Sequence, residues 1–284
     1  MKRVAVIGGG TMGTGIAYVA AQAGGEVFVV EPDNVRAGIM QTAIADAAGS
    51  AVSRGKFAAI EASALICRIE RVGKVQELPE NLDLIVESVP ERIELKRDVL
   101  ASASARSPLL LATNTSALSI DHLAEFVRDP ATFLGMHFFN PVWSLKLVEL
   151  VRGAATSEAA VGAARSLVEW LGKESLTVRD VPGFATSRLD LIASLEAMRM
   201  LESGVASADD IDRAAVLAYR HPVGPLRLSD IVGLDVRLDI ARALSAAHGD
   251  RFEPPEILKA MVAAGHLGAK SGQGFFVWPQ GNAA

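Results

Sequence analysis

The 284-residue sequence predicts an α/β fold with two domains, a doubly wound domain over residues 1–181 and an all-helical domain over residues 182–284. Three observations support this prediction. The chain opens with a short β-branched run, a glycine-rich turn and a helical stretch. Strand and helix signals then alternate as far as residue 181, as in a doubly wound sheet. From Pro182-Gly183 onward, helical periodicity replaces this alternation.

The first strand is expected over residues 3–7, because an apolar, β-branched run is typical of a strand buried on both faces. Gly8, Gly10 and Gly13 follow it in the pattern G-x-G-x-x-G. In this pattern the first glycine permits the tight turn, the second lets the backbone approach a pyrophosphate, and the third lets the helix pack closely on the strand. The turn is therefore a candidate phosphate-binding site.

The next helix and strand supply the rest of a dinucleotide site. A helix is expected over residues 11–23, and the N–H groups of its first turn, from Thr11 and Met12 onward, point toward bound phosphates. The second strand, residues 26–30, ends at Glu31. An acidic side chain there accepts hydrogen bonds from the adenosine ribose and repels a 2′-phosphate, so NAD is favoured over NADP. A purely structural βαβ unit is the weaker alternative.

The later elements of the first domain continue the alternation of helices and strands. We expect each strand to join the same sheet, because short apolar runs separated by helices are typical of a doubly wound fold. These elements are helices over 33–56 and 93–103, and strands over 83–87, 109–113, 133–139, 146–151 and 175–178.

The second domain is expected to contain long helices over residues 184–203, 207–218 and 233–247. Apolar residues cover much of the circumference of the first of these helices. Such a helix needs partners on several sides, so we expect a homodimer that buries it between subunits. A core helix within one subunit is the alternative. The tail, residues 280–284, is expected to be frayed.

Composition excludes several classes of function. The chain has 28 basic and 33 acidic residues, and the resulting net charge of −5 gives no basic surplus for nucleic acid. No run reaches 18 uncharged apolar residues, so no membrane span is expected. The single cysteine, Cys67, excludes disulfides within the chain and is typical of a reducing cytoplasm.

The strand over 133–139 carries the main candidate catalytic residue, His137. It lies near the carboxyl edge of the expected sheet, where doubly wound folds bind ligands. Glu149 lies on the following strand, and two adjacent antiparallel strands place its carboxylate against the imidazole. A carboxylate on one ring nitrogen fixes the tautomer and leaves the other nitrogen to take a hydroxyl proton. No second histidine or cysteine lies at ligand spacing, so no metal is expected.

Two other polar segments follow expected strands. Asn114-Thr115-Ser116 comes directly after residues 109–113, where an amide and a hydroxyl can hydrogen-bond substrate and nicotinamide. Taken alone, this segment is better explained as the N-cap of a helix that starts near Ser119. Residues 87–91 follow a third strand and can approach the nicotinamide ribose.

Together, these motifs resemble the L-3-hydroxyacyl-CoA dehydrogenase family, of the short-chain 3-hydroxybutyryl-CoA dehydrogenase type, over nearly the whole chain. The resemblance implies a Rossmann-type NAD-binding domain followed by a helical domain that binds substrate and forms the dimer. It also implies reversible, NAD-dependent oxidation of a short-chain (3S)-3-hydroxyacyl-CoA to the 3-ketoacyl-CoA. The matching segments are residues 8–13, 87–96, 114–119, 137–141, 146–149, 181–184, 221–225 and 268–275.

The resemblance implies roles for individual residues in this reaction. His137 is the expected base, paired with Glu149. Ser116 is expected to bond the substrate hydroxyl and to help orient the imidazole. Asn114 is expected to contact cofactor or substrate.

Further residues are implied outside this catalytic group. Glu91 and Lys96 match family positions near the nicotinamide. Ser53 and Lys56 lie where family members carry basic residues for the CoA phosphates, although a solvated helix end explains them equally well. Ser187 replaces an asparagine that the family usually carries before an arginine. A serine can hydrogen-bond but is shorter, so the resemblance defines the reaction more closely than it defines the acyl substrate.

Two other functions are weighed against this one. A dehydrogenase of the same fold can act on a free hydroxy acid, such as a sugar acid or carnitine, and Ser187 allows this. The segment 268–275 favours the CoA type. The second alternative is a cofactor-binding structural or sensor protein without catalysis, in which we expect a catalytic residue to be missing. The catalytic group is intact, because His137, Glu149 and Ser116 are all present.

Overall fold

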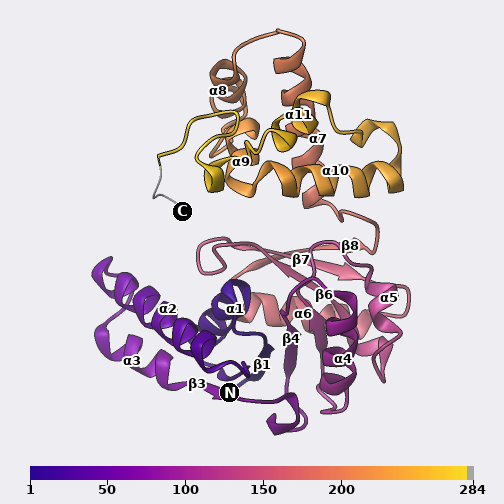
Figure 1. Ribbon diagram of the computed structural model, residues 1–284. Coiled ribbons are helices and arrows are strands. Elements are labelled where there is room, and N and C mark those ends of the chain that lie inside the picture. Colours follow the sequence, from indigo (N-terminus) through magenta and orange to yellow (C-terminus); the bar gives the residue numbers. More distant parts are fainter. Residues whose placement is uncertain (280–284) are drawn as a thin grey trace. The chain divides into compact units, whose positions relative to one another are not determined.

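A computed structural model describes residues 1–279, and the chain divides into two compact units, Met1–Val181 and Pro182–Ala284 (Figure 1). The fraying expected for residues 280–284 lies outside the described residues. Among the described residues, no helix combines the length and the apolar character that crossing a membrane requires.

The first unit is built on one eight-stranded sheet in the order β3-β2-β1-β4-β5-β6-β7-β8. The first six strands are parallel and have the order of a Rossmann-type sheet, which confirms the predicted fold class. Strand β7 runs antiparallel to β6, and β8 runs parallel to β7. The strands are β1 (Arg3–Ile7), β2 (Glu26–Val30), β3 (Ile69–Val72), β4 (Leu84–Glu87), β5 (Leu111–Thr113), β6 (Phe133–Phe138), β7 (Leu147–Arg152) and β8 (Glu174–Arg179).

Helices cover both faces of this sheet (Figure 1). Four of them share a core with alternate sheet residues such as Leu134 and Met136. The residue between these two, Gly135, lies against Ile120 of α5 on the opposite face, because side chains alternate along a strand. The first face is covered by α1 (Thr11–Gln22), α2 (Asn34–Ser53), α3 (Ala59–Cys67) and α6 (Glu158–Trp170), and α5 (Ile120–Ala124) packs beside α4 (Ile93–Ser104).

The edge of the sheet at β3 differs from the sequence-based expectation. Helix α3 and strand β3 were not predicted, and α2 ends at Ser53 rather than near Lys56. Strand β3 has the sequence Ile-Glu-Arg-Val and none of its residues is fully buried. An edge strand of this kind lacks the continuous apolar run that identifies a central parallel strand.

The second unit is helical. Leu191, Leu195 and Met198 of α7 lie in its core, whereas Leu189 of the same helix is 71% exposed. The buried carboxylate of Asp230 accepts hydrogen bonds from the segment after the last helix, including the indole N–H of Trp278. The helices are α7 (Thr186–Glu202), α8 (Ala208–Tyr219), α9 (Pro225–Val232), α10 (Leu234–His248) and α11 (Glu256–Ala263).

Candidate active site

The glycine turn after β1 has the geometry of a phosphate cradle. Gly8 has a φ of +111°, and a Cβ there would lie 2.6 Å from the carbonyl oxygen of Ser88. A Cβ on Gly13 would lie 1.9 Å from the carbonyl oxygen of Gly8, so packing requires glycine at both positions. A Cβ on Gly10 would meet nothing within 4 Å, so this position faces open space. Gly10 also gives α1 no side-chain cap, which leaves first-turn N–H groups for a ligand.

Glu31 lies directly after β2, and its carboxylate is fixed by two backbone donors. The N–H of Gly9 donates to Oε2 at 3.1 Å, and the N–H of Asp33 donates to Oε1 at 3.0 Å. The residue is only 4% exposed, yet it lines the pocket described next. The acidic group is therefore preorganised beside the glycine turn.

A pocket of about 770 Å³ lies along the carboxyl edge of the parallel strands, a volume typical of small-molecule sites. The glycine turn contributes Gly8, Gly10, Thr11 and Met12 to its wall. Glu31 lines one part, and the loops after β4 and β5 line another with Glu91, Asn114 and Ser116, among others. An acidic group for a ribose, free amides for a pyrophosphate and polar groups for a nicotinamide fit a bound NAD.

One part of this wall was not predicted from the sequence. Lys74, Val75 and Gln76, in the loop after β3, also line the pocket. The loop after β3 is expected at this site once β3 is assigned as a parallel strand, because the carboxyl ends of parallel strands meet at one edge of the sheet.

His137 and Glu149 face each other across β6 and β7 in the antiparallel register. The distance from His137 Nδ1 to Glu149 Oε2 is 3.1 Å. Glu149 is fully buried, and His137 is 8% exposed. An ionised carboxylate can only accept, so this contact places the proton on Nδ1, and Nε2 is then the nitrogen that can accept a proton. The strand pairing expected from the sequence is present.

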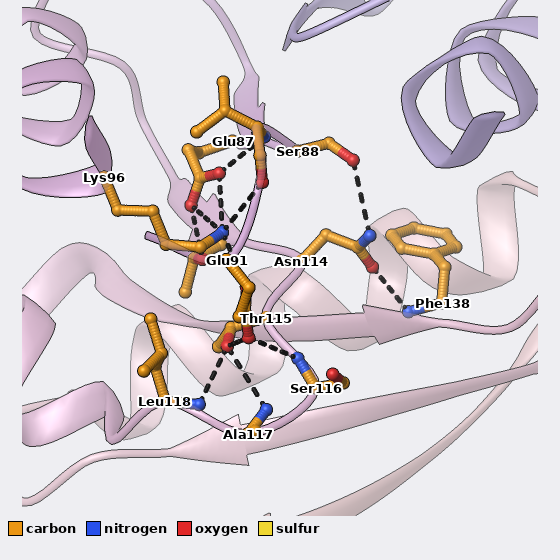
Figure 2. A network of polar contacts seen from close by, with 12 residues as sticks. Glu87, Ser88, Glu91, Lys96, Asn114, Thr115, Ser116, Ala117, Leu118 and Phe138 are labelled. Carbon is orange, nitrogen blue, oxygen red and sulfur yellow. Dashed lines mark hydrogen bonds and ion pairs between the residues drawn. The ribbon is translucent and has the colours of Figure 1, made fainter. Parts of the chain in front are cut away.

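Asn114 links the ends of three neighbouring strands (Figure 2). The backbone N–H of Phe138 donates to its Oδ1 at 2.8 Å, and its Nδ2 donates to Ser88 Oγ at 3.4 Å. The alternative N-cap role does not apply to Asn114 or Ser116, because Ser119 itself caps α5 by accepting from the N–H of His122. Asn114 therefore ties the pocket wall to the strand that carries the histidine.

Glu91 and Lys96 belong to one network (Figure 2). The Lys96 ammonium is 2.8 and 2.9 Å from the two carboxylate oxygens of Glu87 and 3.1 Å from Glu91 Oε2. Glu91 Oε1 accepts from the backbone N–H of Ser116 at 3.2 Å and from the hydroxyl of Thr115. Glu91 lines the pocket, whereas Lys96 is 1% exposed and contacts the pocket wall through Glu91.

The remaining candidates are not among the residues that line this pocket. Ser53 is the exposed last residue of α2, and its hydroxyl donates to the carbonyl oxygen of Ser50. Lys56 lines a separate pocket of about 410 Å³, together with Arg54. Ser187 is partly buried in the first turn of α7, in the second unit.

Comparison with known protein families gives two matches that together cover most of the chain. A family model described as "3-hydroxyacyl-CoA dehydrogenase, NAD binding domain" matches residues 3–181. A second model, described as "3-hydroxyacyl-CoA dehydrogenase, C-terminal domain", matches residues 183–278. The boundary between the two matches coincides with the boundary between the two compact units.

Similar proteins extend over the same length. The chain is 38% identical to a 3-hydroxybutyryl-CoA dehydrogenase of Mycobacterium tuberculosis, over 98% of this chain and 99% of the relative. It is 37% identical to a probable 3-hydroxybutyryl-CoA dehydrogenase of Bacillus subtilis, over 97% of each. The crystal structure of (S)-3-hydroxybutyryl-CoA dehydrogenase from Ralstonia eutropha is similar with a TM-score of 0.94 and 33% identity, and the match covers 99% of this chain and 100% of that one.

Proposed function

The chain belongs to the 3-hydroxyacyl-CoA dehydrogenase family, and from this we propose that it oxidises a (3S)-3-hydroxyacyl-CoA reversibly to the 3-ketoacyl-CoA with NAD. We propose a short acyl chain, as in 3-hydroxybutyryl-CoA, because full-length relatives carry that name. The observation that carries the proposal is the His137–Glu149 pair, which provides an oriented base in the same sheet as a dinucleotide-sized pocket.

We propose that NAD occupies this pocket in a direction set by its wall. Glu31 takes the adenosine ribose, and the turn from Gly8 to Gly13 takes the pyrophosphate. The nicotinamide end then lies beside Glu91, Asn114 and Ser116. When bound, NAD supplies the acceptor for the hydride that leaves C3 of the substrate.

Residues of the chain then transfer the proton and orient the reacting groups. His137 Nε2 takes the proton of the substrate hydroxyl, and the Glu149 carboxylate stabilises the imidazolium that forms. The Ser116 hydroxyl donates to the substrate oxygen, and the Asn114 amide holds the strand that carries the base. In the reverse direction, the imidazolium returns the proton to the carbonyl oxygen.

Recognition of the CoA ester is proposed for residues outside that pocket. Ser53 and Lys56 are exposed and can hydrogen-bond phosphate oxygens of CoA. Because the chain as a whole carries a net charge of −5, local positive charge is needed to attract these phosphates. Ser187 is proposed to hydrogen-bond the substrate. We also propose a homodimer through the C-terminal helices, supported by Leu189 of α7, which is 71% exposed. Cytoplasmic location is proposed because Cys67 is an exposed free thiol.

The test is the consumption of NADH with acetoacetyl-CoA, measured beside free acetoacetate. We expect turnover with the thioester alone. Turnover with the free acid alone would favour the alternative that Ser187 allows, a dehydrogenase of free hydroxy acids. If neither compound is reduced while NADH still binds, the proposed substrate class is wrong.

A further inference from the structure

A carboxylate behind the pocket is the starting point. Glu87, the last residue of β4, is completely buried and does not line the pocket. Its oxygens accept two hydrogen bonds from the Lys96 ammonium, one from the Thr113 hydroxyl at 2.6 Å and one from the N–H of Val89 at 2.7 Å. A buried carboxylate is tolerated in its ionised form when donors surround it in this way.

The ammonium that pairs with Glu87 also pairs with a second carboxylate. Lys96 lies 3.1 Å from Glu91, and its other acceptor is the carbonyl oxygen of Val89 at 3.3 Å. Two carboxylates therefore share one ammonium, and the cluster of Glu87, Lys96 and Glu91 has a formal net charge of −1. Arg92 also lines the pocket nearby, but it is solvent-exposed, so water and salt screen its charge more than the charges of the buried Glu87 and Lys96.

Figure 2 shows Glu91 of this cluster beside Ser116, and both residues line the pocket. Glu91 holds the backbone of Ser116, beside Asn114. Glu31 and the glycine turn account for the adenosine and the pyrophosphate, so the remaining part of a dinucleotide, the nicotinamide ring, is beside Glu91. The negative charge therefore faces the only portion of the cofactor whose charge changes in the reaction.

We propose that this cluster makes the site discriminate between the oxidised and the reduced cofactor. The nicotinamide ring carries a positive charge in NAD and none in NADH, so a fixed negative charge stabilises bound NAD selectively. Glu87 supplies the excess charge and, through Lys96, fixes the Glu91 carboxylate; it is a positioning residue that does not touch the ligand. The inference rests on the proposed NAD site and adds the residues that set its preference for one redox form.

The direct test is Glu87→Gln. Glutamine has nearly the same shape and keeps an oxygen for the ammonium, but it removes one negative charge. We expect the ratio of the dissociation constants, Kd for NAD over Kd for NADH, to rise about three- to tenfold, the effect of one unit charge at roughly 10 Å in a partly screened medium. The affinity for NADH should change less than about twofold. Calorimetric titration with each cofactor gives both constants.

Two control variants separate charge from geometry. Glu94→Gln removes one negative charge from an exposed residue of α4, the helix that carries Lys96, and the ratio should stay unchanged. Thr113→Val removes a hydrogen bond to Glu87 without any change of charge, and the ratio should again stay unchanged. An equal rise of the ratio in either control would overturn the proposal.

Glu91→Gln provides a second route should Glu87→Gln fail to fold. Its side chain is 37% exposed, so the substitution disturbs packing less, and it removes one charge from the same cluster. The ratio should rise in the same direction. An unchanged ratio in the folded variants, with a wild type that binds both cofactors, overturns this inference alone. A wild type that binds neither cofactor overturns the proposed function as well.

Discussion

Replacement of Glu149 by glutamine tests the central contact of the proposed site. The carboxylate is fully buried and lies 3.1 Å from His137 Nδ1. Glutamine keeps the volume and can still accept from Nδ1–H, but it carries no charge. The substitution therefore removes the electrostatic stabilisation of the imidazolium and leaves the base itself in place.

The expected magnitude follows from the distance. Two unit charges about 4 Å apart interact by about 4 kcal/mol at an effective dielectric constant of about 20. Each 1.36 kcal/mol or so changes a rate about tenfold, so the full term corresponds to about 10³ in turnover. Because the amide retains a hydrogen bond, we expect a fall of about 10²–10³ in kcat.

The assay is steady-state NADH formation with saturating NAD and (3S)-3-hydroxybutyryl-CoA, for wild type, Glu149→Gln and His137→Gln, because the imidazolium forms when the reaction runs in this direction. His137→Gln removes the base and should lower kcat by about 10²–10⁴. Binding of NADH, followed by its fluorescence, should remain within about twofold in both variants, because neither residue lines the cofactor pocket.

Two results would refute this reasoning. A Glu149→Gln variant with native NADH affinity and turnover within about threefold of wild type would show that the carboxylate does not stabilise the transition state. A His137→Gln variant with near-normal turnover would remove the histidine from the mechanism altogether.

Three further predictions concern the cofactor, the substrate and the fold. Glu31→Ala should weaken NADH binding about 10- to 100-fold and relax the discrimination against NADPH, because it removes the ribose acceptor; an unchanged ratio of the two affinities would contradict the assigned role. Ser187→Asn should hold or raise activity on 3-hydroxybutyryl-CoA if the serine merely substitutes for the family asparagine, whereas a collapse of kcat/KM would mean that the pocket is shaped around the smaller residue. Burial lowers the pKa of Lys173, whose ammonium donates to the carbonyl oxygens of Val142 and Leu145. Between that lowered pKa and the unfolded value of about 10.4, the unfolded chain binds more protons than the folded protein, so wild-type stability should rise with pH relative to Lys173→Met. Urea unfolding of both proteins at two pH values in this range checks this. A difference in unfolding free energy between the two proteins that does not change with pH would count against it.

The fold class and the cofactor end of the site could be predicted from sequence because their signals are local. The strand at residues 3–7, the glycine turn and Glu31 lie within one short βαβ segment, where backbone sterics and burial dictate each residue type. The pairing of His137 with Glu149 could also be predicted, since two consecutive antiparallel strands place facing side chains opposite each other.

Strand β3 and the role of Lys96 could not be predicted from sequence. Edge strands carry charged residues and lose the apolar run that marks a buried strand, so β3 and the Lys74 loop behind it were missed. Lys96 matched a family position near the nicotinamide, yet only the tertiary structure placed its ammonium between Glu87 and Glu91.

The sequence by itself determined which chemical groups the protein has and where short segments turn, because those properties depend on neighbours along the chain. The tertiary structure decided which of these groups meet. Contacts such as that between Glu87 and Thr113 join residues far apart in the chain, and they follow from the order and register of the strands in the sheet. Burial in that sheet also determines which charges are screened by water and which act on a ligand.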